Sequence, residues 1–202
     1  QLLDLQPLPT SALPKSIRPL FASFKHFNPV QTQVFSSVYE SEASVLICAP
    51  TGAGKTVCAE LALLRLLQAE PAAKAVYLCV KQEQADQAYT RLSERLCADL
   101  GVQGVKLTGE TAADIKLLDR GSVIVATAAQ WDVLSRRWKQ RKHVQQISLY
   151  IADDVHLMAG RGGSVLEIVL SRARYVATQY ERHLRIVALG VSMANARDVG
   201  DW

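Results

Sequence analysis

The sequence lacks a long hydrophobic run. No stretch of its 202 residues approaches the roughly 18 to 20 consecutive apolar residues that cross a bilayer. Its opening residues, QLLDLQPLPTS, also lack the basic and then apolar pattern of a secretory signal. We therefore expect no membrane partner.

Cysteine is sparse, and its spacing is typical of neither a disulfide framework nor a zinc site. The four cysteines form no CxxC pair, and each stands among apolar neighbours. We expect His26, His143 and His183 to be ordinary surface residues. The sequence further predicts buried thiols in a reducing compartment at Cys48, Cys58, Cys79 and Cys97.

Internal repeats and low-complexity tracts are also absent, so we expect one domain. Hydrophobic residues make up 49% of the chain, which is ample for a single buried core. Five of the seven prolines occur by Pro29. This clustering predicts an extended lead-in over residues 1–26, wrapped on a domain of residues 27–202.

The charge is modest in total but unevenly placed, with a formal net charge of +4. Residues 1–100 hold nine basic and nine acidic residues, whereas residues 101–202 hold fourteen basic and ten acidic residues. Five of the positive charges fall within Arg136–Lys142, around Trp138. This segment is either a surface that binds RNA backbone or an acidic partner, or a solvated face.

Short apolar runs alternate with longer helical patterns along the chain. The runs are rich in Val, Ile and Leu, as is typical of strands covered on both faces. The strand–helix–strand order predicts an α/β fold with a doubly wound parallel sheet. The predicted strands are Ser44–Ala49, Ala75–Val80, Gly104–Thr108, Ser122–Thr127, Ile147–Ala152 and Leu184–Leu189, and the clearest helices are Lys55–Ala69, Gln84–Leu100 and Ser164–Glu181.

The first predicted strand runs directly into a glycine-rich loop and a helix. Backbone amides of such a loop cradle phosphates, and glycines let the backbone approach them closely. A lysine adds a full positive charge at the helix N-terminus, and the hydroxyl after it can bind Mg²⁺. The alternative is a plain glycine-rich turn, but the strand–loop–helix context favours a phosphate site. The candidate residues match GxxxxGK[ST] except for an alanine at the first position: Ala49, Pro50, Thr51, Gly52, Ala53, Gly54, Lys55 and Thr56.

An acidic pair, Asp153 and Asp154, follows the fifth predicted strand. A carboxylate at the carboxyl end of a parallel strand faces the ligand crevice, so we expect Asp153 to bind Mg²⁺ together with Thr56. Alone, the pair also fits a helix cap. Beside a phosphate loop it indicates a nucleotide-driven motor, in which His156 would link the nucleotide site to a second domain.

With these two motifs the sequence resembles the superfamily 2 DExD/H-box helicases, which implies a RecA-like P-loop domain. The segment Phe27–Phe35 is similar to the adenine-reading segment of that family and places Gln31 at the position that contacts adenine. Further segments resemble the Brr-two family of spliceosomal RNA helicases, which carry two tandem cassettes and separate paired small nuclear RNAs. The likeness fits the first RecA-like domain of the C-terminal cassette best. These segments are Thr108–Glu110, Trp131–Lys139 and Arg185–Leu189.

Four motifs depart from the family pattern. Relatives carry a glutamate that positions the attacking water where this chain has Asp154, whose carboxylate lies about 1.5 Å further back. A base misplaced by about 1 Å costs on the order of a hundredfold in rate. Val80–Gln84 replaces an RNA-contacting proline-rich motif, Thr127–Ala129 replaces Thr-Pro-Glu, and Gly190–Ala194 replaces a small-hydroxyl coupling triplet.

The resemblance therefore implies a domain that binds ATP or ADP with Mg²⁺ but hydrolyses ATP weakly, within a nuclear helicase of pre-mRNA splicing. Such a cassette would regulate and dock proteins. Its partners would be a second RecA-like domain that supplies an arginine finger, the neighbouring cassette and other spliceosomal proteins, with weakened RNA contacts. The candidate catalytic residues are Asp154 and His156. The alternative function is an active ATP-dependent RNA-unwinding motor. A GTPase is disfavoured because Asn195–Asp198 lacks the lysine of Asn-Lys-x-Asp.

Overall fold

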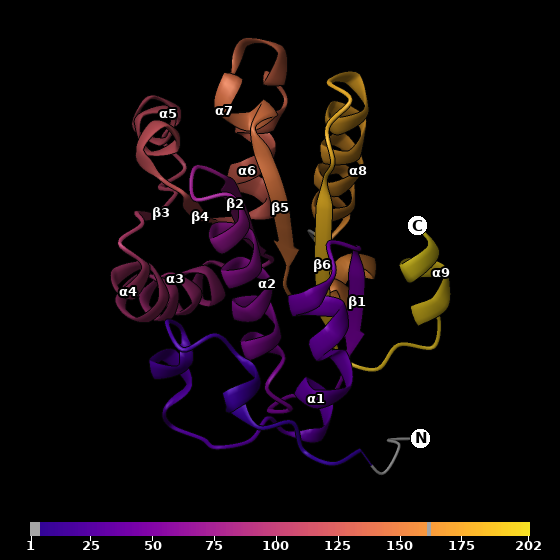
Figure 1. The fold of residues 1–202 in the computed structure, drawn as a ribbon. Helices are drawn as coiled ribbons and strands as arrows, with labels where there is room; N and C mark the ends of the chain where they lie inside the picture. Colours follow the sequence, from indigo (N-terminus) through magenta and orange to yellow (C-terminus); the bar gives the residue numbers. More distant parts are fainter. Residues whose placement is uncertain (1–4, 161–162) are drawn as a thin grey trace.

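A computed structural model describes residues 5–160 and 163–202. In this part of the chain six parallel strands form one sheet, in the order β1-β6-β5-β2-β4-β3 (Figure 1). Because all the strands are parallel, their carboxyl ends meet at one edge of the sheet. The strands are β1 (Val45–Cys48), β2 (Lys74–Cys79), β3 (Gly104–Lys106), β4 (Val123–Thr127), β5 (Ile147–Ala152) and β6 (Arg185–Gly190).

Helices cover both faces of the sheet, which confirms the doubly wound α/β fold. Helices α1, α2 and α3 pack on one face, and α5, α6 and α8 pack on the other (Figure 1). The α-helices are α1 (Pro29–Phe35), α2 (Lys55–Ala69), α3 (Gln82–Arg91), α4 (Ala98–Leu100), α5 (Thr111–Arg120), α6 (Ala128–Ser135), α7 (Lys142–Gln145), α8 (Ser164–Gln179) and α9 (Ala196–Asp201). The 3-10 helices are η1 (Thr10–Ala12), η2 (Arg18–Phe21), η5 (Trp138–Gln140) and η6 (Val155–Ala159), and the π-helical segments are η3 (Ser36–Glu40) and η4 (Leu92–Cys97).

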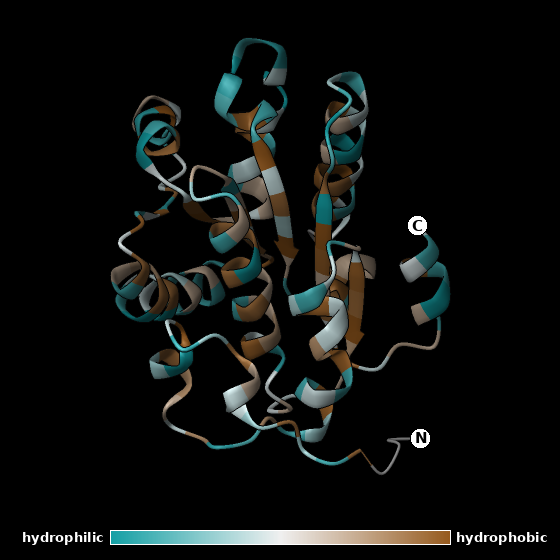
Figure 2. Cartoon of the chain, in the orientation of Figure 1, coloured by the Kyte–Doolittle hydropathy of each residue, from teal (hydrophilic) through white to brown (hydrophobic). Residues whose placement is uncertain are grey.

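Alternate residues of each strand point into two separate cores. On β2, Tyr77 packs with the side of α2, and Leu78 packs with the side of α6 and α8. On β5, Ile151 and Tyr150 divide in the same way. Because both faces are covered, the strands are hydrophobic along most of their length, as their brown colour in Figure 2 shows.

The lead-in, residues 5–26, packs on the face that α2 covers. Its side chains Leu13, Ile17 and Phe21 are buried. The guanidinium of Arg95 lies 5.7 Å from the centroid of the Phe21 ring and donates a hydrogen bond to the carbonyl of Leu20. The path of the lead-in contains the turns η1 and η2. This segment therefore wraps on the domain through short helical turns and is not extended throughout.

The bounds predicted from hydrophobic periodicity agree with the structure for α2 and β5. The other predicted strands and the helix at Ser164 differ by no more than two residues at either end. The helix predicted to begin at Gln84 begins at Gln82 and passes through the π-helical segment η4 before it ends at Leu100. This segment buries Leu92 and keeps the helix against the core.

Three of the four cysteines are buried as predicted, and Cys48 is half-buried. All four thiols are free. Burial raises the pKa of the Cys58 and Cys79 thiols to about 12, so both stay protonated at neutral pH. Among the residues that the structure describes, no helix has the length and apolar composition to cross a bilayer.

Candidate nucleotide site

The candidate site lies at the carboxyl edge of the sheet, the lower edge in Figure 1. The phosphate loop, Ala49–Thr56, follows β1, and Asp153 follows β5. The segment Gly190–Ala194 begins at the last residue of β6. These three strands are neighbours in the sheet, so their loops lie side by side. The segment Val80–Gln84 follows β2, which is the next strand after β5. The fold thus gathers the predicted residues from distant parts of the sequence.

Two glycines shape the phosphate loop. Gly52 and Gly54 have φ angles of +82° and +80°, a conformation that glycine adopts at no steric cost. A Cβ atom on Gly54 would also lie 2.3 Å from Nε2 of Gln31. Helix α2 begins directly after the loop at Lys55, so its unpaired first amides and its dipole favour an anion here.

Lys55 lies across the mouth of the phosphate loop. Its Nζ donates hydrogen bonds to the carbonyl oxygens of Ala49, at 2.7 Å, and Pro50, at 2.9 Å. A phosphate oxygen is a stronger acceptor for an ammonium group than a neutral carbonyl, because both partners are charged. The lysine is therefore placed to exchange these carbonyls for a phosphate.

The side chain of Gln31 supports the phosphate loop from the side of α1. Its Oε1 accepts a hydrogen bond from the backbone amide of Asn28 at 3.0 Å, and its Nε2 donates to the carbonyl of Gly54 at 3.3 Å. Asn28 adds a bond from its Nδ2 to the carbonyl of Ala53 at 3.0 Å. Gln31 is buried, and both ends of its amide contact the protein. Its contact with adenine stays a prediction.

Replacing Gln31 by alanine separates these two roles. We expect the affinity for ATP to fall about two- to tenfold, the effect of losing one or two neutral hydrogen bonds, and the affinity for GTP to fall less. Titration calorimetry with both nucleotides measures the difference. Equal losses for ATP and GTP would show that Gln31 only supports the loop and does not read the base.

Two hydrogen bonds, one of them from a residue of the sheet, fix the carboxylate of Asp153. Its Oδ2 accepts a hydrogen bond from the hydroxyl of Tyr77 on β2 at 2.7 Å, and its Oδ1 accepts from the backbone amide of Asp154 at 3.0 Å. Burial raises the pKa of Asp153 above its ordinary value; the bond from Tyr77 opposes this rise, and the charge of Asp154 adds to it. A cation at this position would relieve the cost of the buried charge.

The donor groups fit a magnesium nucleotide. Mg²⁺ in phosphate-handling sites is commonly held by one or two protein oxygens together with phosphates and water. Thr56 and Asp153 supply a hydroxyl and a carboxylate of this kind, and Lys55 supplies the positive charge for the phosphates. When bound, the cation neutralises charge on the phosphates.

Asp154 stands in an unusual backbone conformation. Its φ of 54° and ψ of 42° lie in the left-handed region, which aspartate enters more readily than most residues. Its Oδ2 accepts a hydrogen bond from Nε2 of Gln84, and its Oδ1 lies 3.8 Å from Nδ1 of His156. Both carboxylate oxygens therefore face groups of the protein.

His156 connects this acidic pair to the segment after β6. Its Nδ1 accepts a hydrogen bond from the backbone amide of Val191 at 3.4 Å. The backbone amide of Ala49 in turn donates to the carbonyl of Gly190 at 3.0 Å. The segment Gly190–Ala194 thus contacts both the phosphate loop and His156, and its coupling role stays a prediction.

Polar side chains at the carboxyl ends of β2, β3 and β4 bond to one another. Nε2 of Gln130, in the first turn of α6, donates to Oε1 of Gln82 at 3.2 Å and to the carbonyl of Leu107 at 3.3 Å. Nζ of Lys106 lies 2.7 Å from Oδ1 of Asp86 on α3. Polar groups at the ends of β2, β3 and β4 are therefore engaged within the domain.

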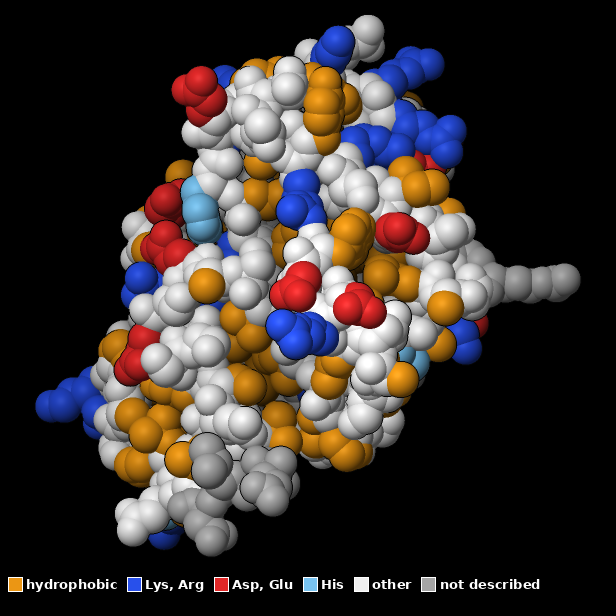
Figure 3. Space-filling model, turned by 90° about the vertical axis from the view of Figure 1, so that its right-hand side faces the viewer, with side chains coloured by type: hydrophobic (Ala, Val, Ile, Leu, Met, Phe, Trp, Pro, Cys, Tyr) orange, Lys and Arg blue, Asp and Glu red, His pale blue; other side chains and the backbone are white. Residues whose placement is uncertain are grey.

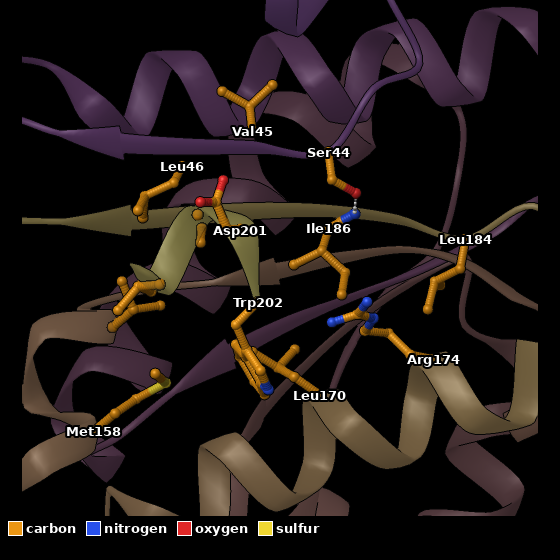
Figure 4. A pocket seen from close by; sticks show the side chains of 14 residues that line it. Ser44, Val45, Leu46, Met158, Leu170, Arg174, Leu184, Ile186, Asp201 and Trp202 are labelled. Atoms are coloured by element: carbon orange, nitrogen blue, oxygen red, sulfur yellow. Dashed lines mark hydrogen bonds between the residues drawn. The ribbon is translucent and has the colours of Figure 1, made fainter. Parts of the chain in front are cut away.

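Two hollows lie near this edge of the sheet. An open groove of about 840 Å³ adjoins the phosphate loop at Ala49 and Pro50, and Ser192 also lines it. A cavity of about 230 Å³ lies between β1, β6, α8 and α9. Leu170 and Trp202 contribute to its mainly apolar wall (Figure 4). The lining of this cavity includes no residue of the phosphate loop, and the lining of the groove includes two of them, Ala49 and Pro50.

For three residues that contact the site, no role in it was predicted from the sequence. Asn28 carries a local signal, because it and Gln31 form a capping box at the start of α1. Tyr77 and Gln84 carry none, since their partners lie 76 and 70 residues away along the chain. Only the order of the strands brings these side chains together.

Comparisons with known proteins agree with this geometry. A sequence model of the family described as "DEAD/DEAH box helicase" matches residues 28–199. The human U5 small nuclear ribonucleoprotein 200 kDa helicase is 50% identical over 204 residues, which cover 100% of this chain and 10% of that protein. The Schizosaccharomyces pombe pre-mRNA-splicing factor brr2 is 48% identical, covering 100% of this chain and 9% of that protein. The chain thus spans about a tenth of the length of these relatives.

A solved structure supports the fold. Mss116p bound to ssRNA and AMP-PNP superposes with a TM-score of 0.81 at 15% sequence identity, covering 97% of this chain and 43% of that one. At this identity the likeness concerns the fold alone. The match of the family model over most of the chain decides the assignment: this protein chain belongs to the DEAD/DEAH box helicase family.

Proposed function

We propose that this chain is the first RecA-like domain of the C-terminal cassette of a nuclear spliceosomal RNA helicase. In this proposal the domain holds ATP or ADP with Mg²⁺, hydrolyses ATP slowly, and regulates and docks other proteins in pre-mRNA splicing. The observation that carries it is the state of Asp154. This carboxylate is one methylene shorter than the glutamate of active relatives and is bonded by Gln84.

The nucleotide-holding residues support the binding half of the proposal. The phosphate loop, with Lys55 and Thr56, and Asp153 follow strands β1 and β5 at the same edge of the sheet. An arginine finger from a second RecA-like domain would complete the site for hydrolysis. Binding and hydrolysis are therefore separable in this domain.

The test is nucleotide content and turnover of the two-domain cassette that contains this chain. We expect the purified cassette to bind ATP and ADP with Mg²⁺ and to hydrolyse ATP far more slowly than an active cassette, with little stimulation by RNA. Turnover at the rate of an active helicase, stimulated by RNA, would favour the motor function. Absence of nucleotide binding would refute both functions.

A basic surface at the opposite edge of the sheet supports the docking role. The segment Arg136–Lys142 leads into β5 from its amino end, remote from the phosphate loop, and Figure 3 shows Lys and Arg side chains gathered at the upper end of the molecule. Arg136 pairs with the buried Asp132, and Arg141 donates to the carbonyl of Leu134 at 2.7 Å. The exposed charges that complete the surface are Arg137, Lys139 and Lys142.

Neutralising Arg137, Lys139 and Lys142 to glutamine should flatten the salt dependence of the interaction that this surface serves. Each charge that meets a polyanion contributes a slope of about one in log K against log salt, so the slope should fall by about two to three. Pull-down and titration against acidic spliceosomal proteins and against RNA measure it. The exposed lysines Lys15, Lys25 and Lys116 provide a control triple substitution. If the salt dependence of binding changes with none of these partners, the segment Arg136–Lys142 is only a solvated face.

A further inference from the structure

The side chain of Gln84 is fixed at both ends. Its Oε1 accepts a hydrogen bond from the backbone amide of Lys81 at 3.1 Å and thereby caps α3. Its Nε2 donates to Oδ2 of Asp154. The side chain is also partly buried. Because both ends of its amide are bonded, a rotation of the amide would break at least one of these bonds.

The left-handed backbone of Asp154 sets the direction in which its short side chain leaves the chain. Its second oxygen lies 3.8 Å from Nδ1 of His156, which accepts a hydrogen bond from the amide of Val191. In hydrolysis, the oxygen of water bonds to the γ-phosphorus, the bond to the bridging oxygen breaks, and ADP leaves. The proton of the water then passes to a base. A carboxylate serves as this base only when one oxygen is directed at the water.

From this geometry we propose that Gln84 is a positioning residue that holds the Asp154 carboxylate away from the attacking water and so keeps hydrolysis slow. The inference rests on the proposed function, because it concerns the same nucleotide site. This inference differs from the short reach of Asp154, since it places part of the hydrolysis defect in a residue of the first turn of α3, the helix that follows β2. It also couples the site to the segment Val80–Gln84, because movement of that segment would release Asp154.

Two substitutions distinguish this role from simple capping of α3. Gln84→Glu keeps an acceptor for the Lys81 amide but removes the donor to Asp154 and repels its charge. Gln84→Met removes both bonds at nearly constant side-chain length. Gln87→Glu, on an exposed residue of the same helix, controls for the added charge.

The experiment measures ATP affinity and turnover of the two-domain cassette for these variants. We expect both Gln84 variants to raise turnover about three- to tenfold, the effect of freeing one hydrogen bond, without changing ATP affinity. We expect Gln87→Glu to change neither. In an Asp154→Asn background the Gln84 variants should have no effect on turnover. In the isolated chain, Asp154→Ala should shift the side-chain amide resonances of Gln84 in an NMR spectrum.

The outcomes separate the two proposals. If wild-type protein binds ATP and the Gln84 variants leave turnover unchanged or lower it, the positioning role is wrong and the proposed function stands. If only Gln84→Met changes turnover, Gln84 acts as a helix cap and the positioning role is wrong. If wild-type protein binds no ATP, the proposed function fails. The NMR shift then still decides whether Gln84 holds Asp154.

Discussion

Replacing Lys55 by alanine should weaken the binding of Mg-ATP by about ten- to a hundredfold, the effect of losing a charge-assisted hydrogen bond to phosphate. Lys55 is the only charged side chain of the phosphate loop, and its Nζ already lies between the carbonyls of Ala49 and Pro50. No other residue of the loop can replace its charge. Titration calorimetry of the two-domain cassette measures the loss.

Lys74 offers a matched control. Its Nζ donates to the carbonyls of Leu118, at 2.7 Å, Asp119, at 3.2 Å, and Gly121, at 2.6 Å, so it also joins backbone segments. It stands at the amino end of β2, remote from the phosphate loop. Lys74→Ala should therefore lower the thermal stability and leave the nucleotide affinity unchanged. Equal affinity of wild type and Lys55→Ala would show that this loop does not hold the phosphates.

Restoring the missing methylene through Asp154→Glu should raise ATP turnover of the two-domain cassette tenfold or more, about 1.4 kcal/mol or greater in barrier height. Nucleotide affinity should stay near normal, because the residues that hold the nucleotide are unchanged. The physical reason is reach, since the longer side chain carries its carboxylate about 1.5 Å further toward the water. A steady-state phosphate-release assay measures the gain, and calorimetry measures the affinity.

Two features of the structure affect the Asp154→Glu variant. The left-handed backbone conformation of this position is less favourable for glutamate than for aspartate, so the variant should lose up to about 1 kcal/mol of folding free energy. The longer side chain also leaves the bond from Gln84, so combining it with Gln84→Met tests whether reach and clamping are separate defects. A small gain in both variants would place the main defect in the coupling segment Gly190–Ala194. Rapid, RNA-stimulated turnover by the unmodified cassette would refute the weak-hydrolysis proposal.

Most of the architecture follows from local patterns. Strands β1 to β6 are apolar runs in the sequence because helices cover both faces of a parallel sheet. The observed strands begin and end within two residues of the predicted bounds. The phosphate loop is equally local, since strand, glycines, lysine and helix are contiguous in the chain. The π-helical segment η4 is different, because its one-residue widening serves the packing of Leu92 and leaves no mark in the periodicity.

The burial of side chains and the pairing of charges also depend partly on local spacing and partly on tertiary packing. Trp131, three residues before the buried Leu134 on α6, is fully buried. The cluster Arg136–Lys142 is evident as five charges, and the spacing of Asp132 and Arg136, four residues apart, is that of a helical ion pair. The contact of Asp132 with Arg172, 40 residues away along the chain, depends on the packing of α6 against α8. The sequence leaves open which of the five charges face solvent.

The sequence by itself determined the fold class, the phosphate loop and the acidic pair, because each is encoded by residues that are neighbours in the chain. The tertiary structure decided how these parts act on one another. The order β1-β6-β5-β2 sets Tyr77 against Asp153 and Gln84 against Asp154. The basic segment lies at the amino edge of the sheet because it precedes β5 and all the strands are parallel. Such contacts depend on which strands lie adjacent, and adjacency is fixed only when the whole chain packs.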